Sequence, residues 1–201
     1  MTPKLVGNAK RGKLFVLSAP AGTGKTTLVK MLTGEFNSVL QSISYTSRKP
    51  RPGETDGVDY NFVDKEQFNE RLGENAFLEH AQVYEDFYGT DKRWVEEKLG
   101  EGKHVFLVID TQGALTVMQK VPCVSIFVFP PSLEELHQRL EHRGTESDAA
   151  LAQRLEWSRR EITKAPYYQY HILNDDLSVA YEVLRSIVIA EDHKQEKIHG
   201  I

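Results

Sequence analysis

The sequence predicts an α/β protein with a parallel sheet flanked by helices. Three short apolar runs, at residues 14–17, 104–109 and 124–129, have the composition of strands that are buried on both faces. Segments with apolar residues at helical spacing alternate with these runs, and this alternation is typical of a parallel sheet. A chain of 201 residues buries about 70 % of its unfolded surface without needing disulfide bonds. We expect a single domain, residues 1–201, either an ordinary one or one with insertions.

Residues 1–12 are polar and are expected to form a loose lead-in to the first strand. That strand leads into residues 18–27, which match a phosphate-binding P-loop. The template Gly-x-x-x-x-Gly-Lys-[Ser/Thr] falls on residues 19–26, with Ala19 at the position of the first glycine. Alanine suits that position if its φ is negative or only mildly strained. The plain alternative is a glycine-rich turn, but the flanking strand and helix pattern are the context that the motif requires.

Backbone N–H groups of such a loop, and the N-terminus of the helix after it, attract phosphate oxygens. Lys25 is then expected to reach the β- and γ-phosphates of a nucleotide, and the Thr26 hydroxyl to bind Mg²⁺. Gly34 marks the expected end of the helix. The predicted phosphate site comprises Ala19, Pro20, Ala21, Gly22, Thr23, Gly24, Lys25, Thr26 and Thr27.

Residues 39–63 change character. Prolines and glycines surround Arg48 and Arg51, which indicates a loop that faces an anion. A solvated basic turn is the alternative, and the segment alone leaves both interpretations open.

Residues 64–99 predict a small lobe. Asp64 and Gln67 form a capping box for a short helix whose Phe68 and Leu72 share one face. A strand is expected at residues 76–83, carrying Glu79. Thr90 or Asp91 is expected to cap a second helix, with Trp94, Val95 and Leu99 turned inward.

Asp110 follows the run at residues 104–109, and the carboxyl ends of strands form the edge where open α/β sheets bind ligands. Its alternative role is that of a simple turn former. Ser132 and Glu135 predict a capping box for a helix with Arg139 and Arg143 on one side. The other side of this helix carries Leu133, Leu136 and Leu140.

A polar interval separates this helix from one that bears Arg154, Arg159 and Arg160. We interpret the last two as solvent-exposed charges. A final short strand is expected at residues 171–174, with Asp175 or Asp176 capping the terminal helix. The buried stripe predicted for that helix is Ala180, Leu184, Ile187 and Val188.

The composition excludes several classes of partner. Twenty-five Lys and Arg against 29 Asp and Glu give a formal charge of −4, so no overall attraction to nucleic acid or an anionic membrane is expected. No stretch resembles a signal peptide or a membrane span. The single Cys123 lies in an apolar run and indicates a buried thiol in a reducing compartment. We expect a soluble, cytoplasmic protein, either a monomer or a homodimer.

Taken together, the ordered motifs resemble guanylate kinase, a P-loop kinase of nucleoside monophosphates, over about residues 13–193. Besides the P-loop, the motifs that carry the resemblance are Ser44-x-Thr46-x-Arg48-x-x-Arg51-x-Gly53-Glu54, Asp59-Tyr60-x-Phe62, Phe77-Leu78-Glu79-His80-Ala81, Tyr88-Gly89-Thr90, Ile109-Asp110-x-Gln112-Gly113, Pro130-Pro131-Ser132, Arg139-Leu140-x-x-Arg143, Arg154 and Asn174-Asp175-Asp176.

The resemblance implies transfer of the ATP γ-phosphoryl group to GMP and dGMP, with Mg²⁺, for guanine nucleotide synthesis and salvage. It implies a P-loop kinase core (residues 13–40, 96–137 and 161–193), a GMP-binding lobe (41–95) and a helical lid (138–160). The implied GMP site is Ser44, Arg48, Arg51, Tyr60, Glu79, Tyr88, Gly89, Thr90 and Asp110. Arg139, Arg143 and Asn174 join the P-loop at ATP, and the implied catalytic residues are Lys25, Arg48, Arg143 and Arg154.

Two alternatives remain at this point. One is a guanylate-kinase-like module that binds a protein partner, although such relatives usually lose the P-loop that this chain keeps. The other is a P-loop kinase with a different phosphate acceptor, against which the pair Glu79 and Asp110 argues. The chain departs from the family at Ala19 and at Val108, where many relatives carry Asp or Glu. Weaker Mg²⁺ binding or slower turnover is the expected effect of Val108.

Overall fold

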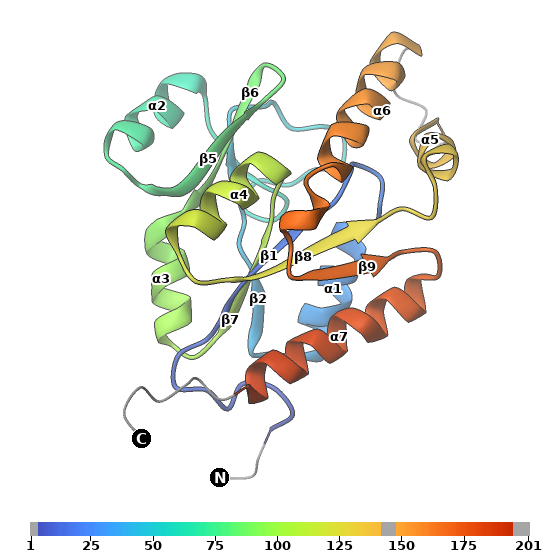
Figure 1. Ribbon diagram of the computed structural model, residues 1–201. Coiled ribbons are helices and arrows are strands. Elements are labelled where there is room, and N and C mark those ends of the chain that lie inside the picture. The colour runs from blue at the N-terminus through green and yellow to red at the C-terminus, as the bar shows by residue number, and fades with distance from the viewer. Residues whose placement is uncertain (1–3, 142–147, 195–201) are drawn as a thin grey trace.

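The computed structural model describes residues 4–141 and 148–194 and contains a central sheet of five parallel strands (Figure 1). The sheet has the order β2-β7-β1-β8-β9. Its strands are β1 (Leu14–Ser18), β2 (Val39–Gln41), β7 (His104–Val108), β8 (Val124–Phe129) and β9 (Tyr170–Leu173). The predicted strands near residues 14, 104, 124 and 171 are therefore confirmed, whereas β2 was not expected.

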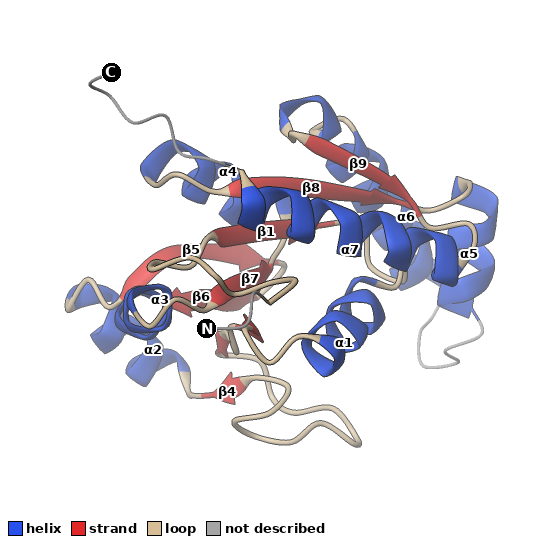
Figure 2. Ribbon diagram, turned by 90° about the horizontal axis from the view of Figure 1, so that it is seen from below, coloured by secondary structure: helices blue, strands red, loops and turns tan. Residues whose placement is uncertain are grey.

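Helices cover both faces of this sheet, which is why the three central strands β1, β7 and β8 are buried along almost their whole length. Successive residues of β1 point to opposite faces. Phe15 and Leu17 pack beneath α1 (Lys25–Glu35) and α7 (Leu177–His193). Leu14 and Val16 pack instead against α3 (Lys92–Gly100) and α4 (Thr111–Lys120). Figure 2 shows α7 lying along the sheet in front of β1 and β8.

A second sheet of four strands, in the order β4-β3-β6-β5, lies beside the first. It contains β3 (Tyr45–Thr46), β4 (Asn61–Phe62), β5 (Phe77–Val83) and β6 (Asp86–Asp91), with α2 (Lys65–Gly73) next to it at the upper left of Figure 1. The aromatic ring of Phe68 stacks on those of Phe77 and Phe87, with centroids 4.7 and 5.6 Å apart. The strand expected at residues 76–83 is β5, and its partner β6 was not expected.

Two helices rise at the upper right of Figure 1, after β8. They are α5 (Leu133–Glu141) and α6 (Asp148–Ile162), and a short 3-10 turn, Ala165–Tyr167, leads from α6 to β9. The Ser132 hydroxyl accepts a hydrogen bond from the backbone N–H of Glu135 at 3.0 Å, as a cap of α5 should. Leu136 is fully buried. Residue 143 and the side chain at position 140 lie outside the described part.

Most predicted helix caps are confirmed. Asp64 and Gln67 form a complete capping box at α2, and Asp91 and Asp176 accept backbone N–H groups at the starts of α3 and α7. All four residues predicted for the stripe of α7 are buried. Leu72, by contrast, is 37 % exposed. Phe68 is the residue through which α2 packs on the sheet, and Leu72 is not covered by it. The helix α1 continues through Gly34 and ends at Glu35, one residue beyond the expected stop.

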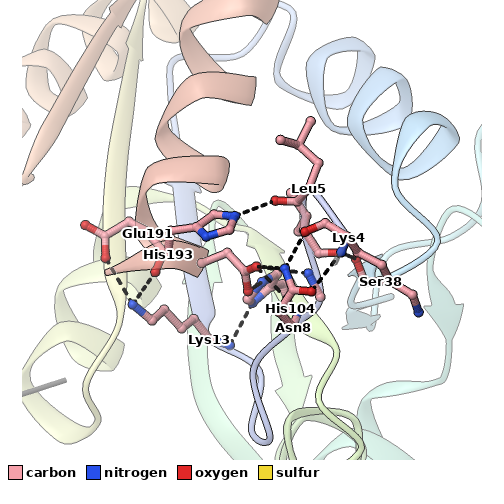
Figure 3. Close-up of polar contacts among 11 residues, drawn as sticks. Lys4, Leu5, Asn8, Lys13, Ser38, His104, Glu191 and His193 are labelled. Carbon is pink, nitrogen blue, oxygen red and sulfur yellow. Dashed lines mark hydrogen bonds and ion pairs between the residues drawn. The ribbon is translucent and has the colours of Figure 1, made fainter. Parts of the chain in front are cut away.

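The described part of the N-terminal segment is held against the core, so the expected loose lead-in is wrong for residues 4–12. Val6 is buried in the core, and the backbone N–H of Gly7 donates to Asp192 Oδ2 at 3.1 Å. Figure 3 shows this segment near His104 and the end of α7. Asp192 also binds Nε2 of the fully buried His104 at 2.8 Å. Among the described helices, none combines the length and the apolar character that crossing a membrane needs.

Candidate functional site

The P-loop connects β1 to α1, as its motif predicts. Gly24 immediately precedes α1 with a φ of +95°, a left-handed conformation that favours glycine. Ala19 is not among the described non-glycine residues with positive φ, which are Asn75 and Tyr84. The replacement of the first P-loop glycine is therefore compatible with the backbone, as expected for a residue of negative φ.

Lys25 and Asn174 both contact the backbone of this loop. The Lys25 ammonium group donates to the carbonyl oxygens of Ala19 and, at 3.3 Å, of Pro20. The buried amide of Asn174 donates to the carbonyl oxygen of Thr23 at 2.6 Å. Arg139 reaches the carbonyl oxygen of Asn174 at 3.5 Å. The loop thus meets α5 and the end of β9 at one place, although it lies more than a hundred positions before both of them in sequence.

A cavity of about 300 Å³ opens between the P-loop, the second sheet and α6. It contains eleven of the residues predicted for the site. These are Ala19, Ala21, Lys25, Ser44, Arg48, Arg51, Tyr60, Glu79, Tyr88, Asp110 and Arg154. Four of them carry permanent positive charge and two are carboxylates, so the cavity suits a ligand with anionic groups and hydrogen-bond donors.

Glu79 is the most deeply buried of these carboxylates, with 2 % of its surface exposed. It projects from β5, and its Oε1 accepts a hydrogen bond from the Thr90 hydroxyl on β6 at 2.5 Å. Burial raises the pKa of Glu79 to about 7, the Thr90 hydrogen bond opposes this, and the charge of Asp110 adds to it. Thr90 does not itself line the cavity; its contribution to the site is the hydrogen bond that it donates to Glu79.

Asp110 follows β7 and caps α4, because its Oδ1 accepts the backbone N–H of Gly113 at 2.8 Å. Burial raises its pKa, while hydrogen bonds from the backbone of α4 lower it. Ser18 ties this strand end to the P-loop by donating its hydroxyl to the Ile109 carbonyl oxygen at 2.9 Å. Asp110 thus caps a helix and also lines the cavity.

Arg48 is held from several sides within the loop that follows β3. Its guanidinium group pairs with Glu54 at 2.8 Å, approaches the Tyr88 hydroxyl at 3.3 Å and lies over the ring of Tyr60 at 5.3 Å. Glu54 also accepts the backbone N–H of Arg51 at 2.8 Å. Glu54 was not assigned a role from the sequence, yet it holds the side chain of Arg48 and the backbone of Arg51, so this basic loop is ordered.

One face of α6 completes the cavity with Arg154, Trp157, Ser158 and Glu161. Glu161 is buried, and burial raises its pKa, while the charge of Lys25 opposes the shift. Trp157 also meets the ring of Tyr84 from the turn between β5 and β6, with centroids 5.3 Å apart. The spacing i, i+3, i+4, i+7 from Arg154 was the signal that could have found these residues.

The exposed arginines of the same helix behave as the sequence indicated. Arg159 and Arg160 have side chains 62 % and 70 % exposed, and both pair with Glu156 on the helix surface. Such exposed pairs add little stability. α6 therefore turns one arginine, Arg154, toward the cavity and two arginines toward solvent.

The other predicted residues that the structure describes do not line the cavity. Pro20, Gly22, Thr23, Gly24, Thr26 and Thr27 belong to the loop and the start of α1 behind it. Gly89 lies in β6 opposite Tyr45. Arg139 forms an ion pair with Glu135 at 2.6 Å, and Arg143 lies outside the described residues.

Other chemistries find less support in the described residues. No three or more His, Cys, Asp and Glu side chains are grouped so as to hold a metal ion within residues 4–141 and 148–194. Burial raises the pKa of Cys123 to about 11, which keeps this half-buried thiol protonated and unreactive near neutral pH.

Comparisons with known proteins agree on one family. The family model described as guanylate kinase matches residues 11–191. The guanylate kinase of Protochlamydia amoebophila is 51 % identical over 193 residues, covering 96 % of this chain and 98 % of the relative. That of Chlamydia felis is 49 % identical over 183 residues, covering 90 % of each chain. The crystal structure of guanylate kinase from Anaplasma phagocytophilum superposes with a TM-score of 0.76 at 31 % identity, covering 96 % of this chain and 91 % of that one.

Proposed function

The chain belongs to the guanylate kinase family, and from this premise we propose that it transfers the γ-phosphoryl group of ATP to GMP, giving ADP and GDP. One observation carries the proposal beyond family membership. A single cavity brings Lys25 of the P-loop together with the carboxylates Glu79 and Asp110 and with arginines from two sides. These are the groups needed for a phosphoryl donor, a guanine base and an anionic transition state.

The reaction needs little covalent help from the protein. The second pKa of a phosphate monoester is ≈ 6, so the acceptor is already largely ionised at neutral pH and no general base is required. The difficulty is to bring two anions into line. Arg48 and Arg51 would hold the acceptor phosphate together with Tyr60, and the ion pair with Glu54 orients Arg48 for this task.

The base is read by hydrogen bonding. Guanine presents two adjacent N–H donors and a carbonyl acceptor, where adenine presents neither the same donors nor the carbonyl. Glu79 and Asp110 would accept from the donors, and the Ser44 hydroxyl would donate to the carbonyl. Thr90 would act by orienting Glu79, while Tyr88 and Gly89 belong to the strand that closes this end. The same contacts admit dGMP, since none of them involves the ribose 2′-hydroxyl.

On the donor side, the loop and the start of α1 would bind the ATP phosphates, with Lys25 at the β- and γ-phosphates. Arg154 faces the cavity, and Arg139 would add positive charge from the neighbouring helix α5. Arg143, which lies outside the described residues, is assigned to ATP by the family resemblance. Asn174 would hold the P-loop in the shape that binds ATP, because its amide donates a hydrogen bond to the Thr23 carbonyl oxygen. We assign residues 41–95 to the acceptor lobe and 138–160 to a lid that excludes water.

Mg²⁺ fits this arrangement through the substrate. Thr26 lies at the start of α1, and its hydroxyl is a hard oxygen ligand of the type that Mg²⁺ accepts alongside phosphates and water. A site built in this way needs no cage of protein carboxylates. When bound, the ion would neutralise charge on the ATP phosphates.

An ADP-release assay tests the proposal. Purified protein with ATP and Mg²⁺ is offered GMP, dGMP, AMP, UMP and dTMP in turn. We expect turnover with GMP and dGMP and much slower turnover with the others. Equal rates with AMP would refute the reading of the base, and binding of nucleotides without turnover with any acceptor would refute the reaction itself.

A further inference from the structure

Gly113 stands between the two carboxylates that face the guanine site. It is a buried residue in the first turn of α4. Its backbone N–H donates to Asp110 Oδ1 at 2.8 Å. On its other side, the carboxyl group of Glu79 occupies the space that a side chain at this position would fill.

The space is too small for both groups. A Cβ placed on Gly113 would lie 3.1 Å from the carboxyl carbon of Glu79, and closer still to Oε2. The far side of the same carboxyl group is fixed, because Oε1 is held by Thr90 at 2.5 Å. Glu79 is 2 % exposed, so its side chain has little room to move elsewhere. A methyl group at position 113 must therefore displace the carboxylate.

The backbone conformation does not account for this glycine. Gly113 lies in a helix and is not among the described glycines with positive φ. Glycine is among the least favourable residues inside a helix, and alanine is the most favourable. The close approach of the Glu79 carboxyl group explains why position 113 carries no side chain.

We propose that Gly113 is a positioning residue that sets guanine specificity by placing both base-reading carboxylates at once. Its N–H orients Asp110, and its missing side chain admits Glu79 to the position where Thr90 holds it. Gly113 itself does not line the cavity, so we expect it to act through the two carboxylates. The inference rests on the proposed function, since it assigns to Gly113 a part in recognising GMP.

The test compares Gly113→Ala with Gly34→Ala. Gly34 is an exposed position in α1 where an added Cβ meets nothing within 4 Å, so this control makes the same chemical change in a helix away from the site. For Gly113→Ala we expect the KM for GMP to rise by about tenfold or more, because hydrogen bonds to a displaced carboxylate are lost. The KM for ATP should stay within about twofold, since the P-loop is untouched.

A double-mutant cycle with Glu79→Ala separates positioning from a general disturbance. If Gly113→Ala acts through Glu79, it should change the KM for GMP by less than about twofold once Glu79 is alanine. Equal effects in both backgrounds would overturn the inference. So would a Gly113→Ala protein whose GMP kinetics match those of Gly34→Ala.

Thermal unfolding of the four proteins of this cycle tests the inference without an activity measurement. They are the parent, Gly113→Ala, Glu79→Ala and the double variant. We expect Gly113→Ala to lower Tm when Glu79 is present and not to lower it when Glu79 is alanine, because the added methyl group then has room. An equal loss of Tm in both backgrounds would contradict the crowding of Glu79. A parent protein that turns over no GMP would refute the proposed function, whereas the Tm comparison would still decide whether Gly113 places Glu79.

Discussion

Glu79 and Thr90 are joined by a hydrogen bond of 2.5 Å between neighbouring strands of the second sheet, and both side chains are buried. Burying a carboxyl group disfavours its charged form. The pKa of Glu79 therefore rises from 4.5 to about 7. The residue proposed to read guanine is thus poised to change charge in the pH range where the protein is assayed.

The first prediction concerns the pH dependence of GMP binding. Only the carboxylate form of Glu79 accepts from both guanine donors, so the KM for GMP should rise as pH falls below about 7. Steady-state kinetics at pH 6, 7 and 8 measure this. The GMP phosphate also titrates near pH 6, and the burial of Asp110 and Glu161 raises the pKa of both carboxyl groups in the cavity. Glu79→Gln controls for all three, because only the contribution of Glu79 is lost in that variant. Identical pH profiles for the two proteins would contradict the role of Glu79.

The second prediction is that the charged form of Glu79, which is needed to bind guanine, lowers the stability of the folded protein. The folded state holds Glu79 protonated up to about pH 7, whereas the unfolded chain releases this proton near 4.5, so stability falls as pH rises between these values. At pH 8, Glu79→Gln removes a penalty on the order of 3 kcal/mol and should raise Tm by several degrees. At pH 4 the gain should vanish. Thermal unfolding of both proteins at these two pH values is the measurement.

Lys25 supports the next prediction. Its ammonium group lies among the carbonyl oxygens at the start of the P-loop, where a phosphoryl group would meet it. Lys25→Ala should lower kcat by about 100-fold or more, as expected when one preorganised donor to a transition state is removed. The KM for GMP should change little, because Lys25 is not assigned to the acceptor. A kcat close to that of the parent would argue against a P-loop kinase.

Val108 supports a prediction about the metal. This residue lines the cavity together with Asp110, at a position where the family resemblance leads us to expect a carboxylate. A carboxylate there would order the water around Mg²⁺, so Val108→Asp should lower the Mg²⁺ concentration needed for half-maximal rate. Val108→Asn is the matched control, because it has the same shape without the charge. Superimposable Mg²⁺ titrations of the three proteins would sink this hypothesis.

His104 leads to a prediction about stability far from the cavity. Burial lowers its pKa below 6.5, the Lys13 ammonium group adds to this, and Asp192 opposes it. The folded state keeps this histidine neutral, with Nδ1 accepting from the backbone N–H of Lys13 at 2.9 Å. Because only the unfolded chain takes up the proton, stability should fall as pH drops below 6.5, by about 1.4 kcal/mol per pH unit.

Urea unfolding at pH 7.5, 6.5 and 5.5 measures this dependence. His104→Gln should flatten it, while the exposed His80→Gln should leave it as in the parent. If the slope survives in His104→Gln, its source lies in other groups.

Much of the fold is predictable because its signals are local. The capping boxes, the apolar strands and the stripe of α7 each depend on a few neighbouring residues. The missed elements break such local rules. β6 is polar and contains Gly89, and the two-residue turn before it uses Tyr84, with a φ of +57°, instead of the usual Asn-Gly. α4 carries Gly113 in its first turn, and the contact with Glu79 gives a reason for that exception.

Some residues of the candidate site also have a signal in the sequence, and others do not. The P-loop is recognisable from spacing alone, and the roles of Glu79 and Arg48 came from the family resemblance. The spacing from Arg154 shows that Trp157 and Glu161 share one face of α6. It does not show that this face lines the cavity, because that depends on how α6 packs in the folded protein. Glu54 is similar, because its pairing with Arg48 depends on how an irregular loop folds back.

The central position of β1 has a consequence for how the chain reaches this structure. β1 comes first in the chain, yet it pairs with β7 on one side and β8 on the other. Residues 13 and 104, which are hydrogen-bonded beside this pairing, are 91 positions apart. At about 5–20 residues per second, a ribosome needs roughly 5–18 s to make that length of chain. During this time the apolar β1 has no partner strand from the central sheet, so a nascent chain is most exposed to aggregation before β7 emerges.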